Sequence, residues 1–383
     1  MGAGRRGTGI LRVPGRLGTF AGDVEIALRD EHLARRQVAV RVARLPTPAG
    51  IGQYGLVPVV PPKLRSGSSV RVIAPSRSLA IIGPEVRAEA DRKLAALGLT
   101  VSFGERVSEC DDFSSSLAAA RLADLHAAFA DPGVDAILTV IGGFNANQLL
   151  TGFDYSLVAA HPKVLCGFSD VTVLSNALYA RTGLVGYSGP HYSSFGMKHQ
   201  FGYTEAGFRA CVMEDGPITL APSPDWSDDA WFLDQEDRHL EQGEGWWVLQ
   251  EGEADGTIVG GNLCTLNLLQ GTSFMPPLEG SVVFAEDDEQ VRPWDFDRDL
   301  VSLLQQPAFA GVRGLVIGRF QKATGMTRDL LAQIVASKPE LAGLPVIANV
   351  DFGHTTPILT VPVGGTVEVR AERRAPRLTI TSH

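Results

Sequence analysis

Residues 136–150, AILTVIGGFNANQLL, are the stretch from which we interpret the fold. The apolar, β-branched run at 137–141 is typical of a buried parallel strand. Gly142 and Gly143 follow at once, and then comes a segment that we expect to be helical. Such a corner exposes backbone N–H groups, and enzymes that attack carbonyl carbons place their nucleophile there. The residue at the apex, Ala146, has no nucleophilic side chain.

The overall composition is that of an ordinary globular protein. The chain has 383 residues, of which 44% are hydrophobic and 20% charged, and this length favours two domains. Since no apolar run reaches the roughly 18 residues that a membrane-spanning helix needs, we expect no membrane partner. A formal net charge of −9 argues against nucleic acid as the main partner.

The cysteines lack the spacing of a metal site. They are scattered through apolar or mixed contexts: Cys110, Cys166, Cys211 and Cys264. We expect reduced core residues in a cytoplasmic protein.

The N-terminal segment differs from the remainder of the chain. Residues 1–60 are rich in Gly, Pro and Arg, and we expect a basic, disordered extension there. Translated upstream sequence and a basic docking arm are the alternatives. The folded chain is expected to begin near Leu64.

Strands and helices are predicted to alternate over residues 64–195. The predicted strands are 69–76, 101–103, 137–141, 164–168 and 184–187, and the predicted helices are 84–97, 116–129 and 171–181. This alternation predicts an α/β fold with a parallel, doubly wound sheet. Chemistry in such sheets lies beyond the carboxyl ends of the strands. Three segments fall there: the Gly142-Gly143 corner, the Ser169-Asp170 turn and the loop that ends in His191.

The second half of the chain changes character twice. Residues 196–255 gather acidic residues and tryptophans without clear periodicity, and we interpret them as a connector and rim. Residues 256–383 are predicted to form a smaller, β-rich domain. Its predicted strands are 282–285, 314–318, 345–348, 365–370 and 377–380.

Three polar residues of this second domain could carry chemistry. Glu286 ends an apolar strand and could orient a histidine, although a solvated acidic loop is the simpler interpretation. His354 lies in a Gly- and Pro-bounded loop, where a histidine is suited to act as a general base. Asn262 follows two glycines and could contact a ligand, but capping the next helix would suffice to explain it.

Six short segments together resemble the LD-carboxypeptidase family of serine peptidases. This family includes the muropeptide LD-carboxypeptidases and the microcin C immunity peptidases. The segments are VIAPS at 72–76, IGGFNAN at 141–147, GFSD at 167–170, GGNL at 260–263, FAED at 284–287 and DFGH at 351–354. The resemblance extends from about Leu64 to about Ile380.

The resemblance implies a Ser–Glu–His triad. Its glutamate matches Glu286, its histidine matches His354, and its serine falls on Ala146, with the N–H groups of Gly143 and Asn147 binding the oxyanion. It also implies a Rossmann-like N-terminal domain, a β-rich C-terminal domain, a homodimer, and chemistry without a metal or organic cofactor. The substrate would be a small peptide or a peptidyl-nucleotide that is cleaved at an amide.

Further residues are expected to contact that substrate. They are Asn145, Ser169, Asp170, His191, Trp247 and Asn262.

The alanine at the expected nucleophile position leaves three explanations open. Ala146 is an engineered replacement, or the chain is a natural homologue that only binds its ligand, or a working enzyme uses another serine, Ser169 or Ser188. In the first two cases hydrolysis is impaired. A nucleotide-binding regulator is a further alternative, but neither GxxxxGK[ST] nor GxGxxG after the first strand is present.

Overall fold

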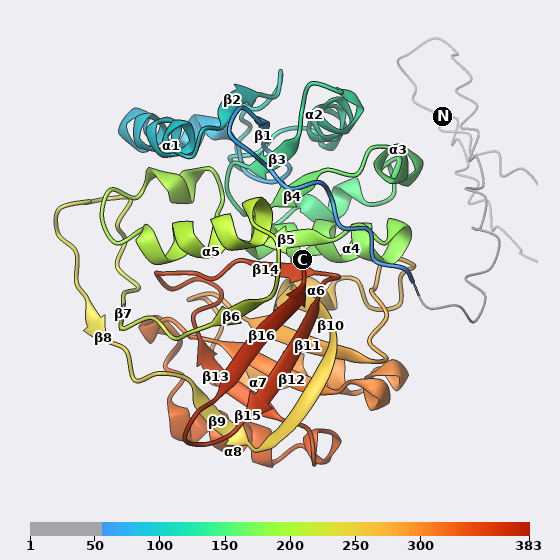
Figure 1. Ribbon diagram of the computed structural model, residues 1–383, viewed down its shortest axis with the longest axis vertical. Helices are drawn as coiled ribbons and strands as arrows, with labels where there is room; N and C mark the ends of the chain where they lie inside the picture. The colour runs from blue at the N-terminus through green and yellow to red at the C-terminus, as the bar shows by residue number, and fades with distance from the viewer. Residues whose placement is uncertain (1–55) are drawn as a thin grey trace, which may run out of the picture. The chain divides into compact units, whose positions relative to one another are not determined.

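Two β-sheets with helices packed on them make up the described chain (Figure 1). The computed structural model describes residues 56–383. Residues 1–55 of the predicted extension therefore lie outside the described part of the chain. The described chain joins the fold before Leu64, because Val59 N–H donates to the Gly183 carbonyl at 2.8 Å. The predicted α/β class, with a parallel sheet and a second β-rich sheet, is confirmed.

The first sheet has the strand order β14-β5-β4-β3-β1-β2. Its strands are β1 (Ser69–Ile73), β2 (Thr100–Phe103), β3 (Ala136–Thr139), β4 (Val164–Cys166), β5 (Gly186–Ser188) and β14 (Val361–Val363). All its pairs are parallel except that of β14 with β5. Since β1, β3 and β4 are neighbours, the loops after these strands meet at one edge.

Helices cover both faces of this sheet, because alternate strand residues enter different hydrophobic clusters. The helices are α1 (Pro84–Ala96), α2 (Ala118–Ala130), α3 (Tyr155–Ala160), α4 (Thr172–Thr182) and α5 (Gly202–Met213). Leu138 packs in the cluster that contains α1 and α5 residues. Its neighbour Ile137 packs in the cluster that contains residues of α2, α3 and α4.

The second sheet has the order β6-β16-β15-β10-β11-β12-β13-β9. Its strands are β6 (Ile218–Leu220), β9 (Trp247–Gln250), β10 (Gly252–Asn262), β11 (Ser281–Glu286), β12 (Gly314–Gly318), β13 (Val346–Val350), β15 (Thr366–Ala371) and β16 (Arg377–Ser382). Its helices are α6 (Leu263–Asn267), α7 (Pro293–Leu304) and α8 (Arg328–Ala336). The four strands from β10 to β13 are parallel, so their carboxyl ends share an edge.

The two halves of the chain exchange strands between their sheets and are also joined by hydrogen bonds. Strand β14 comes from the C-terminal segment yet closes the first sheet, and β6 from the predicted connector closes the second. The N-terminus of α4 is bonded to the end of β10, where Asn262 N–H donates to Thr172 Oγ1 at 3.0 Å. Asn176 adds two hydrogen bonds to Gly260. These bonds hold the start of α4 to the end of β10, the strand that pairs with β11.

Short segments depart from the sequence expectations. The expected helix after Gly143 is only a 3₁₀ turn, Ala146–Leu149, which ends before α3 begins. The segment 196–255 contains α5 and the small β7–β8 ribbon (Asp225–Trp226 and Glu241–Gln242) in addition to β6 and β9. Of the four cysteines, Cys166 and Cys211 are buried and Cys110 and Cys264 are exposed, and all four are free thiols. No helix among the described residues is long and apolar enough to span a membrane.

Candidate active site

Ser169 occupies a strained corner between β4 and α4. Its φ of 62° lies in the left-handed region that non-glycine residues seldom adopt. A strained strand-to-helix turn exposes a side chain at the carboxyl edge of the sheet. Gly142 makes room for it, since a Cβ there would lie 2.8 Å from Ser169 Cβ and 2.9 Å from its Oγ.

A histidine and a glutamate from the second sheet complete a hydrogen-bonded row with this serine. His354 Nε2 lies 3.0 Å from Ser169 Oγ, and His354 Nδ1 lies 2.6 Å from Glu286 Oε2. Glu286 is the last residue of β11 and is buried, and His354 lies in the loop after β13 with 18% of its side chain exposed. A serine that contacts an imidazole held by a carboxylate can be deprotonated for attack on a carbonyl carbon.

The electrostatic surroundings favour the protonated form of His354. Burial opposes the charge on the imidazole, but the Glu286 carboxylate, with Asp288 and Asp287 behind it, outweighs that effect and raises the pKa of His354. Burial, then the charge of Glu286, raises the pKa of Asp287 to about 8. The neutral base therefore forms at a higher pH than it would in a histidine without these carboxylates.

The predicted meeting of Glu286 and His354 over Ala146 is corrected by this geometry. The two side chains meet each other, but the residue beside the imidazole is Ser169. Ala146 is fully buried in a hydrophobic cluster with Leu149, and its N–H donates to Asp170 at 2.8 Å. The alanine fits because its position is an apolar core position.

Three residues that we expected to contact substrate have their polar groups engaged within the protein. The Asp170 carboxylate is buried and accepts the N–H groups of Asn145 and Ala146. The Asn145 amide bonds with Arg121 and with Ser115 Oγ. The third residue, Asn262, caps α6, which was the simpler of the two explanations given for it. Its Oδ1 accepts from Thr265 N–H at 3.1 Å, and its Nδ2 donates to Asp287.

Trp247 and His191, which were also expected to contact substrate, both contact other parts of the protein. Trp247 lies on β9, the edge strand of the second sheet, where it pairs with Ala348 and where Arg328 covers its ring. His191 is closer to His354, since its ring lies 4.4 Å from that of Phe168, which in turn packs edge-on against His354. His191 is buried, however, and Thr139 Oγ1 lies 2.7 Å from its Nδ1. Burial, then the charge of His354, lowers the pKa of His191 to about 3.

The predicted oxyanion donors lie in the turn beside Ser169. Gly143 follows Gly142 directly, and the carbonyl of Gly142 accepts the N–H of Arg77 at 3.3 Å. In a planar trans peptide the N–H points opposite to the carbonyl, so the N–H of Gly143 points away from Arg77. Asn147 lies farther along, on the exposed side of the 3₁₀ turn.

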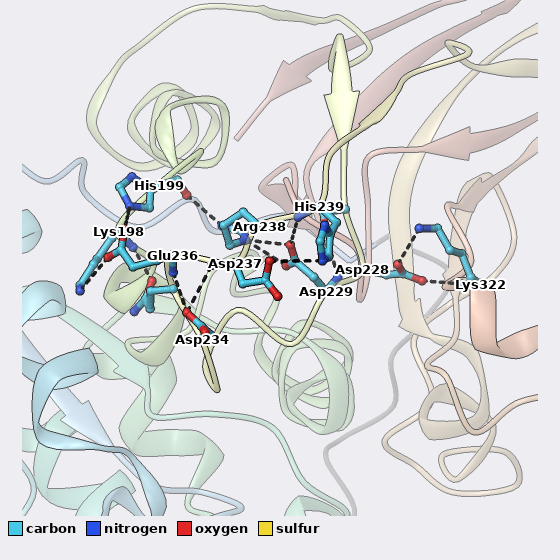
Figure 2. Close-up of polar contacts among 12 residues, drawn as sticks. Lys198, His199, Asp228, Asp229, Asp234, Glu236, Asp237, Arg238, His239 and Lys322 are labelled. Carbon is cyan, nitrogen blue, oxygen red and sulfur yellow. Dashed lines mark hydrogen bonds and ion pairs between the residues drawn. The ribbon is translucent and has the colours of Figure 1, made fainter.

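The rim segment is fastened to the loop that carries His354. Ser227 and Thr356 exchange two backbone hydrogen bonds of 2.8 and 2.7 Å, two residues beyond the histidine. Figure 2 shows the ion pairs that brace this segment: Arg238–Asp229 at 2.9 Å, Lys322–Asp228 at 3.4 Å, and Lys198–Glu236 at 3.2 Å. The rim thus restrains the histidine loop from outside.

Several residues around the site were not predicted from the sequence. Ser76 and Arg121 hydrogen-bond to the loops behind it, and Phe144 is 52% exposed two residues after Gly142. The sequence held one usable signal for the serine itself, because Gly167-Phe168-Ser169 joins a predicted strand to a predicted helix. Among residues 56–383, no three His, Cys, Asp or Glu side chains are grouped to hold a metal ion.

The contact between Gly142 and Ser169 yields a first prediction. The backbone of Gly142 is outside the left-handed region, so Gly142→Ala acts only through its new methyl group. That methyl overlaps Ser169, and we expect kcat/KM for the hydrolysis proposed below to fall about 100-fold because the nucleophile is displaced. The control is Gly202→Ala, since a Cβ there meets nothing within 4 Å. Equal activity of the two variants would contradict the contact.

An α/β chain with this serine, histidine and glutamate row is typical of serine hydrolases. Residues 70–189 match the LD-carboxypeptidase N-terminal domain, and residues 255–369 match the LD-carboxypeptidase C-terminal domain. The chain belongs to the LD-carboxypeptidase family.

Its relatives include named and solved proteins. A putative carboxypeptidase of Bacillus subtilis, YocD, is 49% identical over 321 residues, which are 84% of this chain and 99% of that protein. The crystal structure of an MccF-like protein from Bacillus anthracis is 48% identical with a TM-score of 0.84, and the match covers 85% of this chain and 100% of that one. The microcin C7 self-immunity protein MccF, solved in complex with aspartyl sulfamoyl adenosine, is 25% identical with a TM-score of 0.77, and the match covers 85% of this chain and 99% of that one.

Proposed function

We propose that this chain is a working serine carboxypeptidase or amidase whose nucleophile is Ser169. The observation that carries the proposal is the hydrogen-bonded row from Ser169 Oγ through His354 to Glu286, with distances of 3.0 and 2.6 Å. The explanation that the chain only binds its ligand rested on Ala146. Since Ala146 lies in the core, that explanation loses its support.

The reaction begins when Ser169 attacks the carbonyl carbon of the scissile amide. His354 Nε2 takes the hydroxyl proton and passes it to the leaving amine, which leaves an acyl group on Ser169. A water molecule, deprotonated by the same nitrogen, then releases the acyl group. Glu286 accepts the N–H of His354 Nδ1, so that Nε2 keeps its lone pair toward the serine.

The oxyanion is bound by two backbone N–H groups. One is that of Asp170, because the residue after the nucleophile supplies a donor at this kind of corner. The other is that of Gly143, which points away from Arg77 on the turn that contacts Ser169. Asn147, the second donor expected from the sequence, is replaced in this proposal by Asp170.

The substrate is a small molecule cleaved at one amide. The family description, with relatives named murein peptide and murein tetrapeptide carboxypeptidase, favours a carboxyl-terminal amide of a muropeptide as the first candidate. The likeness to MccF favours an acyl-amino acid joined to a nucleotide-like group as the second candidate. The homodimer and the cytoplasmic location stay predictions.

The two candidates are separated by incubating the purified chain with each. One arm uses a muropeptide tetrapeptide and measures released D-alanine, and the other uses aspartyl sulfamoyl adenosine and measures released aspartate by mass spectrometry. We expect turnover in one arm, and a rate lower by about three or more orders of magnitude with the Ser169→Ala variant. Binding in both arms without any product over hours would contradict the proposed hydrolase and favour a sequestering homologue.

A further inference from the structure

One buried carboxylate ties together the three loops that surround Ser169. Asp170 Oδ2 accepts the hydroxyl of Ser76 at 2.5 Å, after β1. It also accepts the N–H groups of Asn145 at 2.9 Å and Ala146 at 2.8 Å, after β3. Asp170 itself follows the nucleophile after β4 and is 2% exposed. A single oxygen thus takes donors from the loops after two other strands of the sheet, β1 and β3.

A buried arginine completes the arrangement from α2. Arg121 donates to the carbonyls of Pro75 at 2.8 Å and Asn145 at 3.0 Å. Burial lowers the pKa of Arg121, and the charge of Asp170 opposes that shift. A buried carboxylate and guanidinium that each hydrogen-bond to the same turn restrict it from two sides.

The restricted turn is the one that carries the proposed oxyanion donor. Gly142 lies against Ser169, Phe144 N–H donates to Ser76 Oγ at 3.2 Å, and Ala146 N–H donates to Asp170 at 2.8 Å. The Gly142–Ala146 segment is therefore held at both ends and in its middle. An oxyanion donor is effective only when its position is set before the reaction. A displacement of about 1 Å in such a group lowers rates on the order of 100-fold.

We propose that Asp170 is the positioning residue of the oxyanion turn, acting through its carboxylate on Asn145, Ala146 and Ser76. This inference rests on the proposed function and adds a role that is separate from substrate contact. The carboxylate does not touch the reacting atoms. It sets the position of the Gly143 N–H relative to Ser169. It therefore stabilises the transition state and does not change the affinity for the substrate.

The test compares Asp170→Ala with Asp170→Asn. In the alanine variant all three donors lose their acceptor, and we expect kcat to fall about 100-fold while KM changes less than about 3-fold. In the asparagine variant the amide oxygen accepts the same three donors, and we expect kcat to return to within about 10-fold of the parent. The matched control is Asp154→Ala, because Asp154 Oδ1 also accepts three donors but caps the exposed start of α3. The kcat of Asp154→Ala should stay within about 2-fold of the parent value.

A transition-state analogue separates positioning from a merely structural role. A boronic acid analogue of the acyl part forms a tetrahedral adduct on Ser169 with an oxygen in the oxyanion site. Its inhibition constant should rise by the factor by which kcat/KM falls in Asp170→Ala. Ser76→Ala removes one of the three donors, so it should raise the inhibition constant and lower kcat/KM by the same, smaller factor. This variant provides the test if Asp170→Ala does not fold.

Two outcomes overturn the inference. One is an unchanged inhibition constant in the Asp170 or Ser76 variants alongside a lowered kcat, and the other is full activity of Asp170→Ala. Loss of the proposed function is distinguishable, because in that case Ser169→Ala keeps the activity of the parent chain.

Discussion

Replacing Ser169 by alanine is expected to lower kcat by three or more orders of magnitude while the fold persists. The hydroxyl is the group that His354 Nε2 contacts at 3.0 Å, and an alanine offers neither a nucleophile nor a proton. Binding and the oxyanion donors remain, which leaves a residual rate as in other triads that lack one member. The measurement is steady-state release of the amine product, with thermal unfolding to check that the variant is folded.

Two further serine variants make this prediction specific. Ala146→Ser should not raise the activity of the parent chain, nor restore it in Ser169→Ala, because position 146 is fully buried in the core. Ser188→Ala should keep most of the activity, since Ser188 pairs with Val361 within the first sheet. If a serine at position 146 restores the activity of Ser169→Ala, the prediction is wrong and the nucleophile belongs at the Gly142-Gly143 corner.

Replacing Glu286 by glutamine is expected to lower kcat by about 100- to 10,000-fold and to move the acid limb of the pH profile. The glutamine amide can donate to His354 Nδ1, which stabilises the tautomer whose Nε2 carries the proton and cannot accept from Ser169. The carboxylate also raises the pKa of His354 against the effect of burial. Its removal therefore lowers that pKa.

The sign of the pH effect follows from the role of the base. His354 works as a neutral imidazole, so kcat/KM rises with pH through the raised pKa of the parent chain. In Glu286→Gln the same rise should occur at lower pH, although the plateau is reduced. Asp288→Asn is the control, because it keeps the tautomer-setting hydrogen bond and removes a smaller contribution to the pKa. An acid limb that stays in place in Glu286→Gln would rule out His354 as the titrating base.

Local patterns carried much of the fold. The five parallel strands of the first sheet and the helices α1, α2 and α4 were predicted within a few residues, because apolar runs, Gly-Gly corners and helix stops act over short distances. The capping role of Asn262 could be predicted for the same reason, because a helix cap depends on residues that are close in sequence. Residues 202–213 were missed as a helix, since the acidic and tryptophan-rich surroundings of α5 hide its periodicity.

The sequence by itself determined the alternation of strands and helices, the two sheets, and Glu286 and His354 as site candidates. Only the tertiary structure decided which of two similar corners carries the reactive side chain. The segments 142–147 and 167–170 both follow a parallel strand and both begin with glycine, so local patterns do not distinguish them. The bonds from Thr172 and Asn176 hold the start of α4 to the end of β10, and His354 contacts Ser169. The carboxylate of Asp170 accepts the N–H of Ala146, whose side chain is buried in the core. These contacts join residues that are distant in the chain, and no short stretch of sequence encodes them.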